Sequence, residues 1–333
     1  MSDATIITIV ILTAIILSLF NLLTIFVMVM TSKLRKQVSN LPVLSFLIGS
    51  ALQGALPAPL YVYKILQHES GEEPGWLCDL YRFLYILCVH IMEISIMVLG
   101  FDRLFAVKYP FRYPTMITRK KSFMIVAVAW LVTITIDIIP FFNKGKAHDK
   151  CSYVPDSTWG LFVILFYNML PFITVVVNYS AIWKVAYNFA IEDRARSESL
   201  GYNQNTDLLP PTTTDKTKDR SLTGTSHKSI CRFTLEFKAT KTSLAIVAVY
   251  MLCWLPMGCF YMADHFCHNC ISDNKNLSDA RRAVKLLAFS SSLLAPLVYC
   301  WWNKEFRNAA RSVFRQSKEN ADRASLLLMH AVS

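Results

Sequence analysis

The sequence is poor in charged residues and lacks the proportion of charged to hydrophobic residues that a water-soluble protein has. Asp, Glu, Lys and Arg together make up only 17% of its 333 residues, whereas 54% are hydrophobic. The mean hydropathy of +0.37 lies above that of ordinary soluble domains. This composition excludes a soluble enzyme, and no nucleophile and base are arranged for catalysis. We therefore expect no enzymatic activity, no cofactor and no metal site in a chain that belongs in a membrane.

Long apolar runs recur along the chain. About 20 helical residues cross a hydrocarbon core of about 30 Å, and seven runs are long enough, with mostly short loops between them. We predict an all-α integral membrane protein, a seven-transmembrane helix bundle within 1–302. Its helices are expected over residues 4–31, 40–66, 76–108, 120–141, 158–190, 233–264 and 281–302. The first run lacks a preceding basic region and a small-residue cleavage site, so we expect an uncleaved helix rather than a signal peptide.

The positions of Lys and Arg predict an orientation. Basic residues are frequent after the first helix, after the third helix and in the C-terminal region, whereas the loop "QHESGEE" has none. Three lysines within 144–150 weaken this contrast. By the positive-inside rule, the N-terminus is extracellular and the C-terminus cytoplasmic, in a multi-pass plasma membrane protein. The net charge of +11 then faces anionic membrane lipid, and we expect no nucleic-acid partner.

Two segments depart from the apolar pattern. Residues 192–230 are charged, rich in Ser and Thr and interrupted by two prolines, which predicts a disordered third cytoplasmic loop. Its hydroxyl groups are either phosphate acceptors or part of a solvated linker. Residues 303–315 place apolar side chains on one face and basic side chains elsewhere. They predict a short amphipathic eighth helix on the inner leaflet, followed by a cytoplasmic tail over 316–333.

Four of the nine cysteines fall on the predicted outer side. Oxidising conditions there permit two disulfide bonds, Cys78–Cys151 and Cys267–Cys270. The "CHNC" stretch of the second pair is also compatible with a redox or metal pair, although a lone CxxC is weak evidence. Asn276, in "NLS" of the same loop, is a candidate glycosylation site.

The third apolar run contains ionisable residues, and it ends with an acid beside a base. Asp102 and Arg103 are unfavourable at a helix end unless they pair or face a cavity, so they are candidates for function. The alternative is an arginine that merely extends to the interface. Further up the helix, His90 and Glu93 lie three residues apart on neighbouring faces. They are either a buried hydrogen-bonded pair or a proton-sensitive switch.

Landmark residues follow one another along the predicted helices. They are Asn21 in helix one, Cys78 and "DRL" from Asp102 to Leu104 in helix three, Trp130 in helix four, Pro171 with Tyr179 in helix five, "CWLP" ending at Pro256 in helix six, and "APLVY" ending at Tyr299 in helix seven. In this order they resemble the rhodopsin-like (class A) family of G-protein-coupled receptors, over nearly the whole membrane domain. The resemblance implies a receptor that binds an extracellular ligand and activates a heterotrimeric G protein. Receptor kinases and arrestin are further candidate partners.

The resemblance also implies an activation switch. A helix proline such as Pro256 removes a backbone hydrogen bond and lets the helix kink and swing. Arg103 is expected to pair with Asp102 and Glu236 and so to hold helix six against helix three. Its release would let helix six move outward and open a crevice for the G protein, a bistable element biased by ligand. The residues implied in switching and G-protein coupling are Asp102, Arg103, Tyr179, Glu236, Pro256 and Tyr299.

Three positions depart from the family pattern. Leu104 replaces the tyrosine of the Asp-Arg-Tyr motif, Ser50 stands where helix two has an aspartate, and Ala295 stands where helix seven has an asparagine. The last two changes remove oxygen ligands from the family's sodium site, so we expect no sodium modulation. The same groups connect the ligand pocket to the inner face, which makes altered transduction a further expectation.

The implied ligand pocket lies in the outer half of the bundle. Its expected lining residues are Tyr85, Ile86, Val89, Trp254, Met257, Tyr261, Lys285 and Phe289. Receptors for biogenic amines have an aspartate where this chain has Tyr85, so the resemblance favours a non-amine ligand. Lys285 invites an anionic or carbonyl-bearing ligand, unless it extends instead to the outer surface.

Two other functions compete. An opsin-like photoreceptor needs a retinal-binding lysine at the position of Phe289, and Lys285 lies one turn, about 5.4 Å, further out. A seven-helix transporter is the other alternative. It is disfavoured because the sequence has no recognisable repeat, no broken half-helices and a long hydroxyl-rich inner loop.

Overall fold

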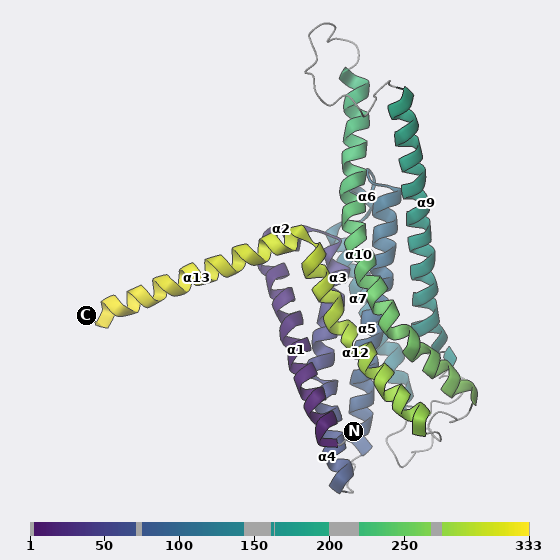
Figure 1. The fold of residues 1–333 in the computed structure, drawn as a ribbon, viewed down its shortest axis with the longest axis vertical. Helices are drawn as coiled ribbons and strands as arrows, with labels where there is room; N and C mark the ends of the chain where they lie inside the picture. Colours follow the sequence, from purple (N-terminus) through teal and green to yellow (C-terminus); the bar gives the residue numbers. More distant parts are fainter. Residues whose placement is uncertain are drawn as a thin grey trace.

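The computed structural model describes residues 3–70, 75–142, 161–162, 164–199, 220–267 and 275–332. Within these ranges the elements are all helical, and the long helices run side by side as one bundle (Figure 1). They are α1 (Asp3–Met30), α2 (Ser32–Lys36), α3 (Asn40–Ala55), α4 (Pro57–Ser70), α5 (Gly75–Lys108), α6 (Tyr113–Met116), α7 (Arg119–Phe142), the π-helix η1 (Ile164–Met169), α9 (Leu170–Ser199), α10 (Arg220–Cys267), α12 (Lys275–Trp302) and α13 (Lys304–Val332).

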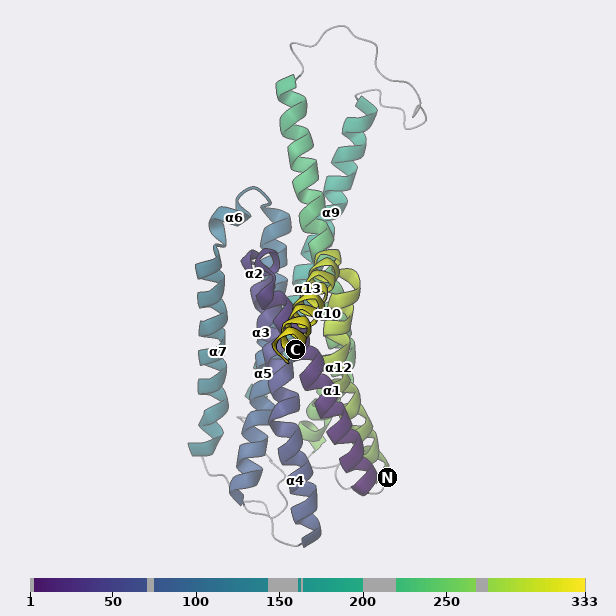
Figure 2. The same cartoon turned by 90° about the vertical axis from the view of Figure 1, so that its left-hand side faces the viewer.

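Seven spans in the described ranges are long and apolar enough to cross a membrane. They cover Ile7–Met30, Asn40–Tyr63, Trp76–Lys108, Arg119–Ile139, Ile164–Glu192, Thr240–Cys267 and Asp279–Trp302. The predicted all-α class and the seven-helix bundle are therefore confirmed. The N-terminus lies at one end of the bundle, which we call the N-terminal end (Figures 1 and 2). The short helices α2 and α6 lie at the opposite end, which we call the α6 end.

Two of the predicted spans are interrupted. The second consists of α3 and α4, which meet at Leu56, because Pro57 and Pro59 cannot donate the amide hydrogen bonds of a continuous helix. The Leu56 amide still bonds the Leu52 carbonyl at 2.9 Å. The fifth span starts as the wide turn η1 and continues as α9. Pro171 is the second residue of α9 and follows η1 directly, so its missing amide leaves a gap in the hydrogen-bond ladder where the π-helix passes into the α-helix.

Two helices extend into the segment that is predicted to be a disordered loop. α9 continues to Ser199 and α10 starts at Arg220, so both ends of the predicted disordered loop 192–230 are helical, and residues 200–219 lie outside the described residues. Both helices project beyond the rest of the bundle at the α6 end (Figures 1 and 2).

The helix after the bundle is longer than expected. α13 begins after Asn303, whose Oδ1 accepts the Phe306 amide at 3.0 Å, and it continues to Val332. The short helix over 303–315 with a separate tail over 316–333 is therefore not confirmed. The physical reason is that no proline or glycine follows Lys304 to end the helix. α13 leaves the side of the bundle at the α6 end (Figure 1), and its position on an inner leaflet stays a prediction.

The core forms around α5, which packs against α3, α7, α9 and α10. Two glycines allow α3 to approach its neighbours closely. A Cβ atom on Gly49 would lie 2.9 Å from Ile91 Cγ2 of α5, and one on Gly54 would lie 2.5 Å from Ser18 Oγ of α1. Large apolar side chains also cover the outside of the bundle, such as Leu19 and Leu131, each more than 60% exposed. That surface suits contact with lipid rather than water.

Candidate functional site

A buried acid–base cluster lies at the α6 end of α5. Arg103 Nε donates to Asp102 Oδ2 at 3.0 Å, and the guanidinium Nη2 contacts the same oxygen. The Tyr113 hydroxyl, from α6, donates to Asp102 Oδ1 at 2.6 Å and accepts a hydrogen bond from Arg103 at 3.4 Å. Arg103 is only 1% exposed. Both carboxylate oxygens are thus paired, which a buried ion pair requires to be stable.

Sequence reasoning identified Asp102 and Arg103 but missed Tyr113. Its signal in the sequence was weak, because "YPFRY" contains two tyrosines and nothing local distinguishes them. The fold distinguishes them, since Tyr113 is buried whereas Tyr109 is exposed.

The other residues of the implied switch are distributed around this end of the bundle. Tyr179 packs in a small apolar cluster with Leu104, Val107, Ile182 and Phe237, and its buried hydroxyl has no hydrogen-bond partner in the described ranges. Leu104, which replaces the family's tyrosine, therefore serves as packing between α5 and α9.

Tyr299 lies at the end of α12. Its hydroxyl donates to Asn40 Oδ1 at 3.3 Å, and its ring meets Phe306 edge-on with centroids 5.3 Å apart. Pro256 lies inside α10 as predicted. Glu236 is in the same helix, but its side chain is outside the described part of the chain, so a pair with Arg103 stays a prediction.

A neutral polar centre lies between α1, α3 and α12, where the family resemblance implies a sodium site. The Ser292 carbonyl accepts from Asn21 Nδ2 at 3.0 Å and from Ser50 Oγ at 2.9 Å. The Ser292 hydroxyl donates to Gln53 Oε1 at 2.7 Å. Ala295, nearby on α12, contributes only a buried methyl group. Short neutral hydrogen bonds thus connect the three helices at this level.

A lysine surrounded by tyrosine rings lies toward the N-terminal end. Lys285 Nζ of α12 lies 4.6 Å from the ring centroid of Tyr85, 5.5 Å from that of Tyr61 and 5.9 Å from that of Tyr81. It also donates to the Tyr81 hydroxyl at 3.4 Å. We call these four residues the Lys285 cluster. Its geometry favours cation–π attraction, and the ammonium points at rings of α4 and α5.

Sequence reasoning placed Tyr85 and Lys285 together but missed Tyr61 and Tyr81. The spacing of Tyr81 and Tyr85, one turn apart on α5, was a usable signal, because residues four apart share a helix face. Their rings stack with centroids 6.0 Å apart. Tyr61 could not be foreseen, because only the kink after α3 determines where α4 carries it.

The remaining predicted pocket residues lie in one apolar cluster with Tyr85. Tyr85, Val89, Trp254 and Met257 are buried, and Ile86, Tyr261 and Phe289 pack against them. Trp254 Nε1 donates to Ser291 Oγ at 3.0 Å, and its ring stacks on Tyr250 with centroids 5.8 Å apart. The structure therefore brings together the residues that the sequence assigned to a ligand pocket.

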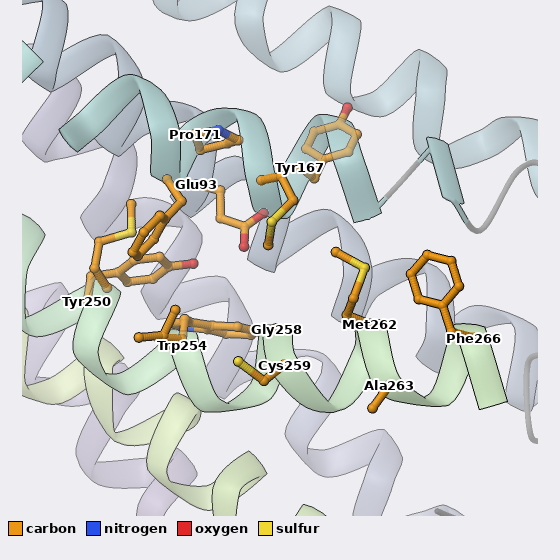
Figure 3. Close-up of a pocket in the computed structure, with 14 residues that line it drawn as sticks. Glu93, Tyr167, Pro171, Tyr250, Trp254, Gly258, Cys259, Met262, Ala263 and Phe266 are labelled. Carbon is orange, nitrogen blue, oxygen red and sulfur yellow. The ribbon is translucent and has the colours of Figure 1, made fainter. Parts of the chain in front are cut away.

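A cavity of about 550 Å³ opens between α9 with η1 and α10, beside that cluster (Figure 3). Glu93 of α5 and Tyr250 and Trp254 of α10 lie at its inner wall, and Phe266 lies toward the outer end of α10. Glu93 is only 4% exposed, and its Oε2 has no hydrogen-bond partner in the described part of the chain. Sequence reasoning did not predict this cavity, although it selected Glu93 as an unusual intramembrane acid.

Of the two alternatives for His90 and Glu93, the hydrogen-bonded pair is wrong, and a proton-sensitive switch stays a prediction. His90 Nδ1 lies 2.7 Å from Asp137 Oδ1 of α7, and the His90 ring stacks on Tyr167 with centroids 3.7 Å apart and planes within 7°. The spacing of three residues places His90 and Glu93 on neighbouring faces, and α7 supplies a carboxylate to only one of those faces. Glu93 is left to face the cavity.

The described cysteines divide into bonded and free ones, and the compartments predicted for them stay predictions. Cys78 and Cys267 are disulfide-bonded. Cys151 and Cys270 lie outside the described residues, so the two pairings stay predictions. Asn276 is exposed at the start of α12, where its glycosylation also stays a prediction.

A seven-helix membrane bundle with these clusters at its two ends has the architecture of a heptahelical receptor. The chain matches the family model described as "7 transmembrane receptor (rhodopsin family)" over residues 20–299. It therefore belongs to this family of G-protein-coupled receptors, which are not enzymes. Together with the seven spans, membership implies a multi-pass plasma membrane protein and removes the transporter alternative.

Similar proteins include receptors named for amines. The chain is 23% identical over 323 residues to an octopamine receptor beta-2R of Chilo suppressalis, covering 92% of this chain and 78% of that protein. It is 26% identical over 305 residues to a D(1) dopamine receptor of Carassius auratus, covering 83% and 78%. It is 25% identical over 300 residues to a D(5)-like dopamine receptor of Takifugu rubripes, covering 86% and 61%. These relatives do not support the expected preference for a non-amine ligand.

Proposed function

We propose that this chain binds an extracellular ligand in the N-terminal half of the bundle and activates a heterotrimeric G protein at the α6 end. The observation that carries the proposal is the buried cluster of Asp102, Arg103 and Tyr113. A buried ion pair is a poor way to stabilise a helix bundle, and it is better suited to selecting one of two arrangements. The hydrogen bonds and ion pair of this cluster, which we call the latch, stabilise the resting arrangement of the helices.

The moving element is α10. Pro256 interrupts its hydrogen-bond ladder, Trp254 packs in the same apolar cluster as Tyr85, and its long α6-end portion projects beyond the bundle. A ligand that shifts Trp254 or Met257 would tilt the α6-end portion about the proline. The side chains of Arg103, Tyr179 and Tyr299 would then line the opening. The N-terminus is extracellular in this proposal and the C-terminus cytoplasmic, with receptor kinases and arrestin as later partners.

The proposed ligand is anionic or carbonyl-bearing and binds at the Lys285 cluster. Lys285 supplies a positive charge, and the rings of Tyr61, Tyr81 and Tyr85 supply hydroxyl groups and flat apolar faces. A cationic ligand would be repelled there. The names of the similar receptors point instead to amines such as octopamine and dopamine. Screening both ligand classes on the wild type and on Lys285→Met decides between them, because an anionic or carbonyl-bearing ligand loses affinity in that variant and a cationic ligand does not.

The test of coupling is G-protein dissociation in cells that express the full chain, first without ligand. The Arg103→Ala variant is compared with the wild type and with Arg119→Ala, which removes an exposed arginine at the same end. Arg103 also lines the opening for the G protein, so its removal should abolish coupling even though the resting-state contact is broken. Basal dissociation that is lost only in Arg103→Ala therefore supports the proposal. Equal basal signals from Arg103→Ala and the wild type, at matched surface expression, contradict the assigned role of Arg103.

A further inference from the structure

The cavity between α9 and α10 contains a buried acid that the proposed receptor mechanism does not use. Its inner wall carries the Glu93 carboxylate, which points into the space between η1 and α10 (Figure 3). Glu93 Oε2 has no hydrogen-bond partner in the described ranges. Such a group is unfavourable in apolar surroundings unless a donor or a cation meets it.

The nearby basic groups do not provide that partner. His90, one turn away on α5, is directed to Asp137 at 2.7 Å. Lys285 is held among tyrosine rings and does not line the cavity. No Lys, Arg or His is present among the described residues that form the cavity wall. The acid and the space in front of it are therefore available to a ligand.

The other residues of the cavity wall indicate what kind of molecule the cavity could hold. Glu93 is the one acidic side chain among the described wall residues, and the others are mostly aliphatic, aromatic or sulfur-containing. The volume of about 550 Å³ lies within the range of sites for small organic molecules. Tyr250 and Trp254 present aromatic rings beside the carboxylate, and such rings attract organic cations.

The route into the cavity runs through the lipid-facing surface. Leu255 and Phe266 are 44% and 66% exposed, and Cys259 is exposed on the same helix. These side chains border the cavity on the outside of the bundle. A molecule that partitions into the membrane can therefore reach Glu93 without passing the positive charge of Lys285.

We propose that this cavity is a second ligand site, which binds a lipophilic organic amine through an ion pair between its ammonium group and the Glu93 carboxylate. The apolar body of the amine lies along α10 toward Phe266. Tyr250 and Trp254 contact the ammonium end. This site is separate from the Lys285 cluster and requires no G-protein coupling, so its test is a binding measurement.

The experiment uses the full chain in lipid nanodiscs and two matched probes, 4-phenylbutylamine and the neutral 4-phenyl-1-butanol. The thermal unfolding midpoint is measured against probe concentration, because a ligand that binds only the folded state raises it. The wild type is expected to bind the amine about tenfold more tightly than the alcohol, since a hydrogen bond to a charged group adds roughly that much affinity. In Glu93→Gln the two probes should bind equally.

Further variants locate the site. Ala263→Trp places a large side chain at the exposed mouth of the cavity and should weaken binding of both probes. Val128→Trp, on the exposed face of α7, is its control and should leave binding unchanged. Lys285→Met should keep the preference for the amine. In the wild type, the amine should also slow maleimide labelling of Cys259, measured by peptide mass spectrometry, a readout that does not depend on any substitution at Glu93.

Four results would overturn the site. They are equal affinity of the wild type for the two probes, an amine preference that survives Glu93→Gln, loss of that preference in Lys285→Met, and the absence of any probe binding or Cys259 protection up to the solubility limit. If Glu93→Gln fails to fold, the Ala263→Trp comparison and the labelling of Cys259 still decide. A failed coupling test with Arg103→Ala leaves all of these measurements interpretable.

Discussion

The Tyr113 hydroxyl lies 2.6 Å from Asp102 Oδ1 and so joins the short helix α6 to the acid–base pair of α5. The connection between the third and fourth membrane spans thereby takes part in the buried cluster. The resting geometry of Arg103 depends on this contact, because Asp102 is held by Tyr113 on one oxygen and by Arg103 on the other.

The first prediction concerns this contact. Tyr113→Phe removes the hydrogen bond donated to Asp102, which contributes about 1 kcal/mol, together with the longer one accepted from Arg103 at 3.4 Å. Loss of the first alone would shift the equilibrium about fivefold toward the open state. Basal G-protein dissociation should rise accordingly in cells with matched surface expression. Tyr109→Phe, which alters an exposed ring in the same segment, is the control. Unchanged or reduced basal signal in Tyr113→Phe would contradict the latch.

The second prediction concerns the His90–Asp137 pair. Asp137→Ala leaves the buried His90 Nδ1 without its hydrogen-bond partner, and an unsatisfied buried polar group costs about 1–3 kcal/mol. The thermal unfolding midpoint of the purified chain in nanodiscs should fall clearly. Asp79→Ala removes the exposed partner of Arg82 and should have little effect, because exposed pairs contribute about 0–1 kcal/mol.

A double-mutant cycle with His90→Phe separates the pair from its surroundings. Once Asp137 is absent, substitution of His90 should produce little further loss, because contacting residues are energetically coupled. Additive losses for the two substitutions would show that the pair does not stabilise the fold.

The third prediction concerns close packing of α3 against α1. Gly54→Ala places a Cβ atom 2.5 Å from Ser18 Oγ and 2.9 Å from the Ala14 carbonyl oxygen, so the two helices must separate. Such overpacking costs about 1–3 kcal/mol. Surface expression and the unfolding midpoint should both fall. Gly100→Ala is the matched control, since its Cβ would meet only the Asn178 side chain at 3.2 Å. A larger loss in Gly100→Ala would refute this account.

The fourth prediction concerns sodium. The polar centre around Ser50 and Ser292 consists of neutral groups that bond one another, and Ala295 offers no side-chain oxygen. Replacing Na⁺ by K⁺ at constant ionic strength should leave the unfolding midpoint of the wild type unchanged. Ser50→Asp combined with Ala295→Asn restores two oxygen ligands and should make the midpoint sodium-dependent. A sodium response of the wild type would show that other oxygens bind the ion.

Much of the fold was predictable from the sequence because hydropathy is a local property. A run such as 120–141 is apolar enough to identify a span without knowledge of its neighbours, and α7 occupies nearly the same residues. Helix ends were harder to predict. Whether helix structure continues beyond Glu192 or Arg315 depends on the absence of a stop signal rather than on apolar length.

The candidate sites were predictable only in part. Asp102 and Arg103 are adjacent, so their pairing follows from the chain itself, whereas Tyr113 joins them through a turn that the sequence does not specify. His90 and Glu93 appeared to be partners because they are close in sequence. In the structure His90 instead forms a hydrogen bond with Asp137, which is 47 residues away.

The sequence by itself determined the class of the protein, because apolar length requires membrane-spanning helices and each backbone hydrogen bond must form within its own span. It also determined the family landmarks and the ion pair at the end of α5. Only the tertiary structure decided which polar groups meet across helices. The direction of each helix face depends on kinks, close glycine contacts and neighbouring helices. That is why Lys285 lies among three tyrosine rings while the Glu93 carboxylate faces a cavity.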